Sequence, residues 1–283
     1  MNGSLEARKR WGTIMFAVTG ACAAVSLGVL VFILGYIAWH GLGAITWDFL
    51  TRLPAPVGES GGGIANSILG SLKVVGVAAA IGVPVGVFAA VYVSEYAGGG
   101  LAFLVRFAGD VLNGVPSIVI GVFAFAMVVR PMRHFSGLAG SVALALILIP
   151  IVLRNTEEFL RLVPQNIREA ALALGVPRWK VVLRVVLPTA SRGILTGILL
   201  AVARVSGETA PLIFTAFGNR FWDKGVLQPI ATLPHTIFVN AISPYEEWHR
   251  QAWAAAAVLM AVVVTANVAA RWMLGGLAGE SHG

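Results

Sequence analysis

Long apolar segments constrain the fold of this chain more than any other feature of its sequence. A helix of about 20 apolar residues is long enough to cross a lipid bilayer. Segments of this kind recur along the chain, at residues 13–39, 66–93, 104–129, 138–160, 191–217 and 251–274. Backbone amides and carbonyls inside lipid must be hydrogen-bonded within the protein, so such segments form helices. The pattern predicts an all-α membrane protein with six transmembrane helices.

The composition agrees with a membrane protein and argues against a nucleic-acid-binding one. Hydrophobic residues make up 58% of the chain, charged residues make up 12%, and the mean hydropathy is +0.84. The net charge is +7, yet the basic residues flank the apolar segments instead of forming a patch interleaved with aromatic residues. We therefore expect one transmembrane domain at residues 13–274, in contact with membrane lipid, and no nucleic-acid partner.

The distribution of basic residues predicts which parts of the chain face the cytoplasm. Loops rich in Lys and Arg stay on the cytoplasmic side of a membrane, and such residues cluster at the N-terminus and at residues 154–192. We expect residues 1–12 and the tail 275–283 to be cytoplasmic, in a multi-pass protein of the bacterial inner (plasma) membrane. Arg130 and Arg133, in a short loop expected outside, run against this rule.

The basic region contains a pattern typical of two short helices joined by a glycine. A helix is expected after Pro164, over residues 165–174. Gly175 suits the left-handed conformation that ends helices, and Pro177 has the fixed φ that opens the next one. We call this element, at about residues 161–190, the knuckle. Because its charged residues are costly to bury in lipid, the knuckle is expected outside the membrane, where a soluble partner can bind it.

The knuckle resembles the EAA loop of ABC-importer permeases. The matching residues are Glu169, Ala170, Ala171, Gly175, Leu187 and Pro188, with Val185 where the family usually has isoleucine. The resemblance implies a type I ABC importer (MetI-like) permease fold, in which Glu169, Ala170, Ala171 and Gly175 dock onto an ATP-hydrolysing subunit.

Other sequence features indicate a subunit with no catalytic residues of its own. The chain has no G-x-x-x-x-G-K-[ST] phosphate loop, so ATP and Mg are expected on the partner and no cofactor on this chain. Its five histidines lack metal-binding spacing, and no metal site is expected.

The fifth apolar segment carries two charges near its centre, Arg204 and Glu208. A charge at mid-membrane costs about 2.5–3.5 kcal/mol even on the most lenient scale. Spaced i, i+4 on one helix, the two residues would share a face that must point to protein or to water. Pro211 would leave the carbonyl of Gly207 without its helical partner. We expect a transport path along this face; the alternative is that the two charges only neutralise each other or bridge to a partner helix.

The third apolar segment is interrupted by Gly114-x-Pro116, with polar Asn113 and Ser117 beside the interruption. Arg106 and Asp110, also spaced i, i+4 and closer to the cytoplasmic end, are expected to pair.

Together with Gly61-Gly62-Gly63-Ile64 and the run at residues 206–211, this interruption resembles the A-type permease subunits of phosphate importers. These belong to the binding-protein-dependent (MetI-like) permease family, and the resemblance covers about residues 60–270. It implies that Arg204 and Glu208 take part in phosphate passage. Asn113 and Ser117 are further candidates for the pathway.

The same resemblance implies a set of partners. They are a homologous C-type phosphate permease subunit, two ATPase subunits and an extracytoplasmic phosphate-binding protein. A permease for another oxyanion is an alternative within the same class. A secondary transporter is an alternative from a different class, but it would show inverted repeats and no docking loop, and we find no such repeat.

Two features predict how the helices pack. Small residues allow helices to approach closely in lipid, and they recur in the second segment (Gly70, Gly76, Gly82, Gly86) and in the fifth (Gly193, Gly197). Residues 226–240 are too apolar for a free loop and are expected to pack as a re-entrant or interfacial element on the outer side.

Overall fold

The computed structural model describes residues 2–56, 59 and 61–276, and these residues are mostly helical and form no strand. Of the predicted tail 275–283, residues 277–283 lie outside the described part. Five helical stretches are long and apolar enough to cross a membrane, and there are six if one bent pair counts as a single span. This confirms the predicted fold class, an all-α membrane protein.

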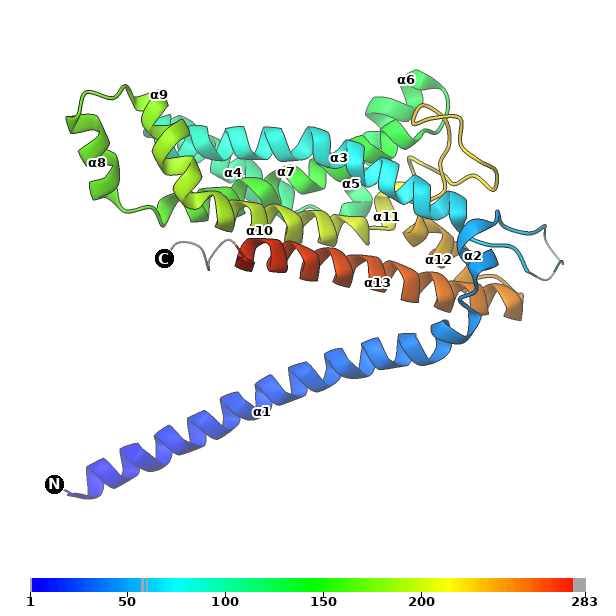
Figure 1. The fold of residues 1–283 in the computed structure, drawn as a ribbon, viewed down its shortest axis with the longest axis horizontal. Helices are drawn as coiled ribbons and strands as arrows, with labels where there is room; N and C mark the ends of the chain where they lie inside the picture. The colour runs from blue at the N-terminus through cyan, green and yellow to red at the C-terminus, as the bar shows by residue number, and fades with distance from the viewer. Residues whose placement is uncertain (1, 57–58, 60, 277–283) are drawn as a thin grey trace.

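The elements follow one another along the chain as a series of long helices separated by short ones (Figure 1). The long helices are α1 (Asn2–Gly41), α3 (Ala65–Val91), α4 (Gly100–Gly114), α7 (Gly137–Arg161), α10 (Leu187–Ser206) and α13 (Glu246–Gly276). The short ones are α2 (Trp47–Thr51), α5 (Ser117–Ala124), α6 (Arg130–Met132), α8 (Gln165–Ala173), α9 (Arg178–Val181), α11 (Ala210–Ile213) and α12 (Leu233–Ala241). A 3₁₀ turn at Leu42–Ala44 follows α1, and wider π turns occur at Tyr92–Tyr96, Phe125–Val129 and Val182–Val186.

The third predicted span is not one straight helix. Helix α4 and the helical stretch Ser117–Met132, which begins with α5, meet at an angle of 103°. Val115, between them, has an extended backbone with ψ of 128°, as expected for a residue whose helical conformation is disfavoured by the proline that follows it. The predicted interruption of this segment at Gly114-x-Pro116 is confirmed.

The fifth predicted span, residues 191–217, also needs correction. Helix α10 begins earlier, at Leu187, and ends at Ser206. Pro211 lies in the first turn of the separate helix α11, where a proline is tolerated because its missing N–H has no partner to lose. Gly207, Glu208 and Thr209 therefore form a break between two helices, which we call the central break.

Helices α3 and α7 form the centre of the core. Leu148 and Val152 of α7 are fully buried and pack where α3 has glycine. A Cβ atom on Gly82 would lie 3.1 Å from Leu148 Cδ2, and one on Gly86 would lie 2.8 Å from Val152 Cβ. These two glycines thus allow the close helix approach that the sequence predicts. Gly76 of α3, by contrast, has no neighbour within 4 Å and faces away from the bundle.

Helix α10 packs on α7 through the glycines predicted for the fifth segment. A Cβ on Gly193 would lie 2.1 Å from Phe159 Cδ1, and one on Gly197 would lie 2.9 Å from Asn155 Cβ. Further along α10, Val205 joins a buried cluster with Leu144 and Leu148 of α7. Helix α7 therefore touches α3 and α10, and it connects the two ends of the molecule.

The segment at residues 226–240 packs into the bundle, as predicted. Ile230 is fully buried, and the carbonyl of Ala231 approaches Gly70 so closely that a Cβ there would lie 1.9 Å from it. The amide of Leu138, at the start of α7, donates to the carbonyl of Val226 at 2.7 Å. The segment closes the end of the bundle opposite the knuckle.

Helix α1 stands apart from the rest of the molecule (Figure 1). The 18-residue apolar window that qualifies it as a membrane span has no buried residue. It meets α13 only near its C-terminal end, where Tyr36 lies edge-on to Trp253 with ring centroids 5.5 Å apart. The start of α1 and the end of α13 lie at the same end of the molecule as α8 and α9 (Figure 1).

Candidate docking and translocation sites

The knuckle has the geometry that its sequence predicts. Helix α8 begins directly after Pro164 and ends at Ala173, one residue before the predicted end. Gly175 follows with φ of +78°, and its amide donates to the carbonyl of Leu172 at 2.9 Å. No atom lies within 4 Å of a Cβ built on Gly175. The backbone conformation, not lack of space, therefore requires glycine here.

Most of the knuckle surface points away from the membrane bundle. Glu169 and Ala170 are exposed, whereas Ala171 is half-buried against a second core cluster. The apolar side chains of Leu172 and Leu174 are also exposed, Leu174 by 84%. An exposed apolar surface of this kind commonly marks a protein interface. Leu172 and Leu174 are not part of the EAA motif, so the sequence analysis missed them. Their apolar side chains within a basic loop were the sequence signal that could have identified them.

Arg204 lies on the last turn of α10, at about the level of the middle of α7. Its neighbour Val205 packs against Leu144 and Leu148, close to the midpoint of that helix. The Arg204 side chain is exposed and that of Glu208 is half-buried. Within the described part of the chain, neither makes an ion pair or a side-chain hydrogen bond.

The expected shared helical face of Arg204 and Glu208 is therefore wrong. Helix α10 ends at Ser206, and the amide of Glu208 donates to the carbonyl of Val205 in a turn at 3.1 Å. Pro211, three residues later, does not interrupt a helix but starts the next one. Mutual neutralisation of the two charges is not what the structure shows, since they form no pair.

The two interrupted segments meet in space. Gly121 of α5 lies so close to α11 that a Cβ on it would be 2.6 Å from Pro211 Cα. Ser117 is half-buried one turn before Gly121, and Asn113 is exposed at the end of α4. The structure thus brings the α4–α5 bend beside the central break, although the residues lie about ninety positions apart in the chain.

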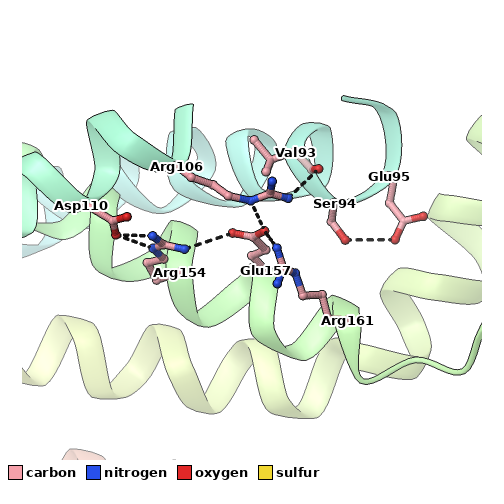
Figure 2. Close-up of polar contacts among 8 residues, drawn as sticks. All are labelled: Val93, Ser94, Glu95, Arg106, Asp110, Arg154, Glu157 and Arg161. Atoms are coloured by element: carbon pink, nitrogen blue, oxygen red, sulfur yellow. Dashed lines mark hydrogen bonds and ion pairs between the residues drawn. The ribbon is translucent and has the colours of Figure 1, made fainter. Parts of the chain in front are cut away.

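A cluster of paired charges lies at the C-terminal end of α7 (Figure 2). Glu157 is 2% exposed and accepts hydrogen bonds from Arg106 Nε at 2.7 Å and Arg161 Nη2 at 2.6 Å. Arg154 Nη1 lies 3.7 Å from Glu157 Oε2, and Arg154 Nε donates to Asp110 Oδ1 at 2.9 Å. We call these five residues the paired cluster.

The predicted pairing of Arg106 with Asp110 is wrong. Both residues pair with α7 instead, Arg106 with Glu157 and Asp110 with Arg154. The i, i+4 rule describes isolated helices, but here a neighbouring helix offers oppositely charged partners, one of them buried. A sequence gives no direct sign of which helices are neighbours, so the cross-helix pairs were missed.

No group of three or more potential metal ligands occurs among the described residues.

The chain resembles known proteins in both sequence and structure. The family of binding-protein-dependent transport system inner membrane components matches residues 82–277. The phosphate transport system permease protein PstA of Yersinia pestis is 43% identical over 93% of this chain and 90% of its own length. PstA 1 of Mycobacterium tuberculosis is 39% identical over 87% of this chain and 82% of its own.

A solved structure with a similar fold is an inward-facing MetNI methionine ABC transporter. The TM-score is 0.63 at 16% identity, over 75% of this chain and 95% of the other. At this identity the match supports the fold alone. The family match and the PstA relatives, in contrast, each cover most of the chain. The chain therefore belongs to the binding-protein-dependent transport system inner membrane components and, among them, to the PstA phosphate transport permeases.

Proposed function

We propose that this chain is the transmembrane permease subunit of an ATP-driven importer that moves inorganic phosphate across the cell membrane. The observation that carries this proposal is its identity of 43% to a phosphate permease over nearly its full length. The exposed Arg204 adds a chemical reason, because a guanidinium group binds phosphate oxygens well.

The anion path runs along the central break in this proposal. An unpaired charge at mid-membrane cannot face lipid without a large cost, so Arg204 faces a water-filled path or a second protein. Glu208, Asn113 and Ser117 would line the same region. A homologous C-type permease subunit would cover this face and enclose the path. The exposed helix α1 is further apolar surface that a second subunit or lipid would cover.

The knuckle is the proposed docking site for the ATPase. Glu169 and Gly175 would set its charge and its angle, Ala170 would keep its exposed surface flat, and Ala171 would anchor it against the bundle. Two such permease subunits would dock two ATPase subunits, which bind ATP and Mg themselves. This assignment puts the knuckle and both chain termini in the cytoplasm, in line with the basic residues around it.

The opposite end of the molecule would then face the phosphate-binding protein. A cavity of about 290 Å³ opens there between α3, α12 and the start of α13. Its lining includes polar side chains on each of these elements, Asn66, His235 and Gln251. Asn66 is buried and donates to the carbonyl of Asn219, so the half-buried His235 and Gln251 are the groups that a delivering protein would meet.

The substrate can be tested with the reconstituted four-part complex in vesicles. Phosphate, presented by its binding protein, should stimulate ATP hydrolysis and be taken up, whereas sulfate should do neither. If another oxyanion with its own binding protein stimulates the complex and phosphate does not, the chain serves that oxyanion instead. ATP-independent uptake by this chain alone would point to a secondary transporter.

The docking role has a separate test. Replacing Glu169 with arginine should weaken copurification of the ATPase while leaving the permease in the membrane. Cysteine labelling of intact cells, in a Cys22→Ser background, checks the orientation. A cysteine near Arg178 should label only after the cells are opened, and labelling from outside would contradict the docking proposal.

A further inference from the structure

Helix α8, which carries the docking residues, is held to the membrane bundle by very few side chains. It has no fully buried residue, and only Arg168 and Ala171 along it are not exposed. Ala171 contributes one methyl group to a core cluster that includes Leu160 and Val186. A single methyl group restrains position weakly, so the orientation of α8 depends on Arg168.

The guanidinium group of Arg168 joins three elements. Its Nη2 donates to Glu95 Oε1 at 2.9 Å and to the carbonyl of Leu160 at 2.7 Å, and its Nε donates to Glu95 Oε2 at 3.3 Å. Its Nη1 donates to the carbonyl of Val163. Leu160 lies in the last turn of α7, whose end carbonyls lack helical partners. One side chain thus ties α8 to the end of α7 and to Glu95.

Glu95 belongs to the π turn Tyr92–Tyr96 that continues α3 toward the knuckle. Its side chain is 7% exposed and that of Arg168 is 14% exposed, so water screens the pair little. A fork-shaped guanidinium fixes direction as well as distance when it binds both oxygens of a carboxylate. The pair therefore specifies the angle between α8 and the end of α3.

Two neighbouring residues of α8 point in different directions. Arg168 points into the bundle, while Glu169 beside it is exposed to a partner. Arg168 binds the end of α7 and the π turn that continues α3, and α3 and α7 pack closely on each other through Gly82 and Gly86. A force on the exposed face of α8 would reach this helix pair through the Arg168 side chain.

We propose that Arg168 and Glu95 form the positioning link that transmits movement of the knuckle to α3 and α7. The proposal rests on the docking function proposed above. It predicts a particular failure: without the link, the ATPase still docks and hydrolyses ATP, but hydrolysis no longer drives the bundle. A contact that only stabilised the fold would lower both activities together.

The test compares Glu95→Gln with Glu158→Gln in the reconstituted complex. Both changes remove one negative charge, but Glu158 is exposed and lies outside the link. The quantity measured is phosphate taken up per ATP hydrolysed, per assembled complex. We expect Glu95→Gln to lower this ratio about tenfold, within the usual range of coupling between distant sites, and Glu158→Gln to leave it unchanged.

A second variant keeps the charge and removes the fork. Arg168→Lys retains one ionic contact with Glu95 but cannot reach both oxygens and both carbonyls at once. Its ratio should fall between those of the wild type and Glu95→Gln. An unchanged ratio in both variants, or uptake and hydrolysis that fall in equal proportion, would overturn the link.

The two proposals fail in different ways. The link is wrong if Glu95→Gln complexes couple normally while Glu169→Arg still weakens copurification of the ATPase. The docking function is wrong if Glu169→Arg has no effect on copurification. The amount of ATPase bound and the coupling ratio therefore separate them.

Discussion

The paired cluster and the central break both bring charge into the membrane bundle, but they treat it in opposite ways. In the paired cluster, Glu157 is buried and three arginines surround it. Beside the central break, Arg204 and Glu208 have no ionic partner within the described residues, and helix α10 ends between them, at Ser206.

The difference indicates that the two regions have different roles. Charges that satisfy one another fix helices in place, because removing one partner leaves the other buried and unpaired. A charge with no partner in its own chain adds nothing to that chain's fold and is explained by what it meets in the assembly. The paired cluster is therefore expected to matter for stability, and the central break for transport.

The largest effect is expected from Arg204→Gln. Uptake of phosphate should fall at least about a hundredfold, comparable to losing a group that contacts the transported ion. Thermal stability of the purified subunit in detergent should change little, because Arg204 has no partner to strand. Radiolabelled uptake and the amount of assembled complex are the two measurements.

A control and a cycle sharpen this prediction. Arg52→Gln removes the same charge from an exposed surface pair with Asp48 and should leave uptake near the wild-type level. In Arg204→Gln/Glu208→Gln, the two effects on stability should add, since the residues do not touch. A strong non-additive rescue would show that they pair after all and would erase the contrast with the paired cluster.

The next largest effect is expected from Gly175→Val. A side chain at φ of +78° costs about 1–2 kcal/mol, and the elbow would change its angle to avoid this. Phosphate-stimulated ATP hydrolysis should drop several-fold while the permease still inserts. Gly76→Val is the matched control, since both glycines have open space around them and only Gly175 has positive φ. Equal losses in the two variants would contradict a conformational role for Gly175.

Stability tests the paired cluster itself. Glu157→Gln should destabilise the folded subunit by about 3 kcal/mol, because the three arginines lose their buried counter-charge. Glu158→Gln, one residue away and exposed, should change stability by less than about 0.5 kcal/mol. The midpoint of thermal unfolding in detergent reports both. If Glu157→Gln unfolds at the same midpoint as the wild type, the paired cluster does not stabilise the C-terminal end of α7.

Local signals in the sequence predicted much of this structure correctly. Pro164, Gly175 and Pro177 each dictate a backbone conformation by their own chemistry, and the knuckle has the predicted form. Gly82 and Gly86 also mark the α3–α7 contact. These features need no knowledge of which helices are neighbours.

Two predictions that depended on which elements are neighbours were wrong. Arg106 and Asp110 satisfy a local rule, yet both pair with residues of α7 more than forty positions away. The end of α10 at Ser206 was missed for a related reason. The apolar segment at residues 191–217 predicted one helix with Pro211 inside it, but the structure has two helices, and the second, α11, packs against α5. Periodicity alone carries no information on such tertiary contacts.

The smallest effect is expected at the contact between the two interrupted segments. In Gly121→Ala, the new Cβ would lie 2.6 Å from the Pro211 backbone, so α5 and α11 must move apart. Overpacking of this kind costs about 1–3 kcal/mol, and we expect uptake to fall two- to fivefold with most of the complex still assembled. Gly114→Ala, at a glycine with no atom within 4 Å, is the control. If Gly121→Ala lowers stability without lowering uptake per assembled complex, the contact belongs with the paired cluster as scaffold. If uptake per complex falls, the geometry of the central break itself governs passage of the ion.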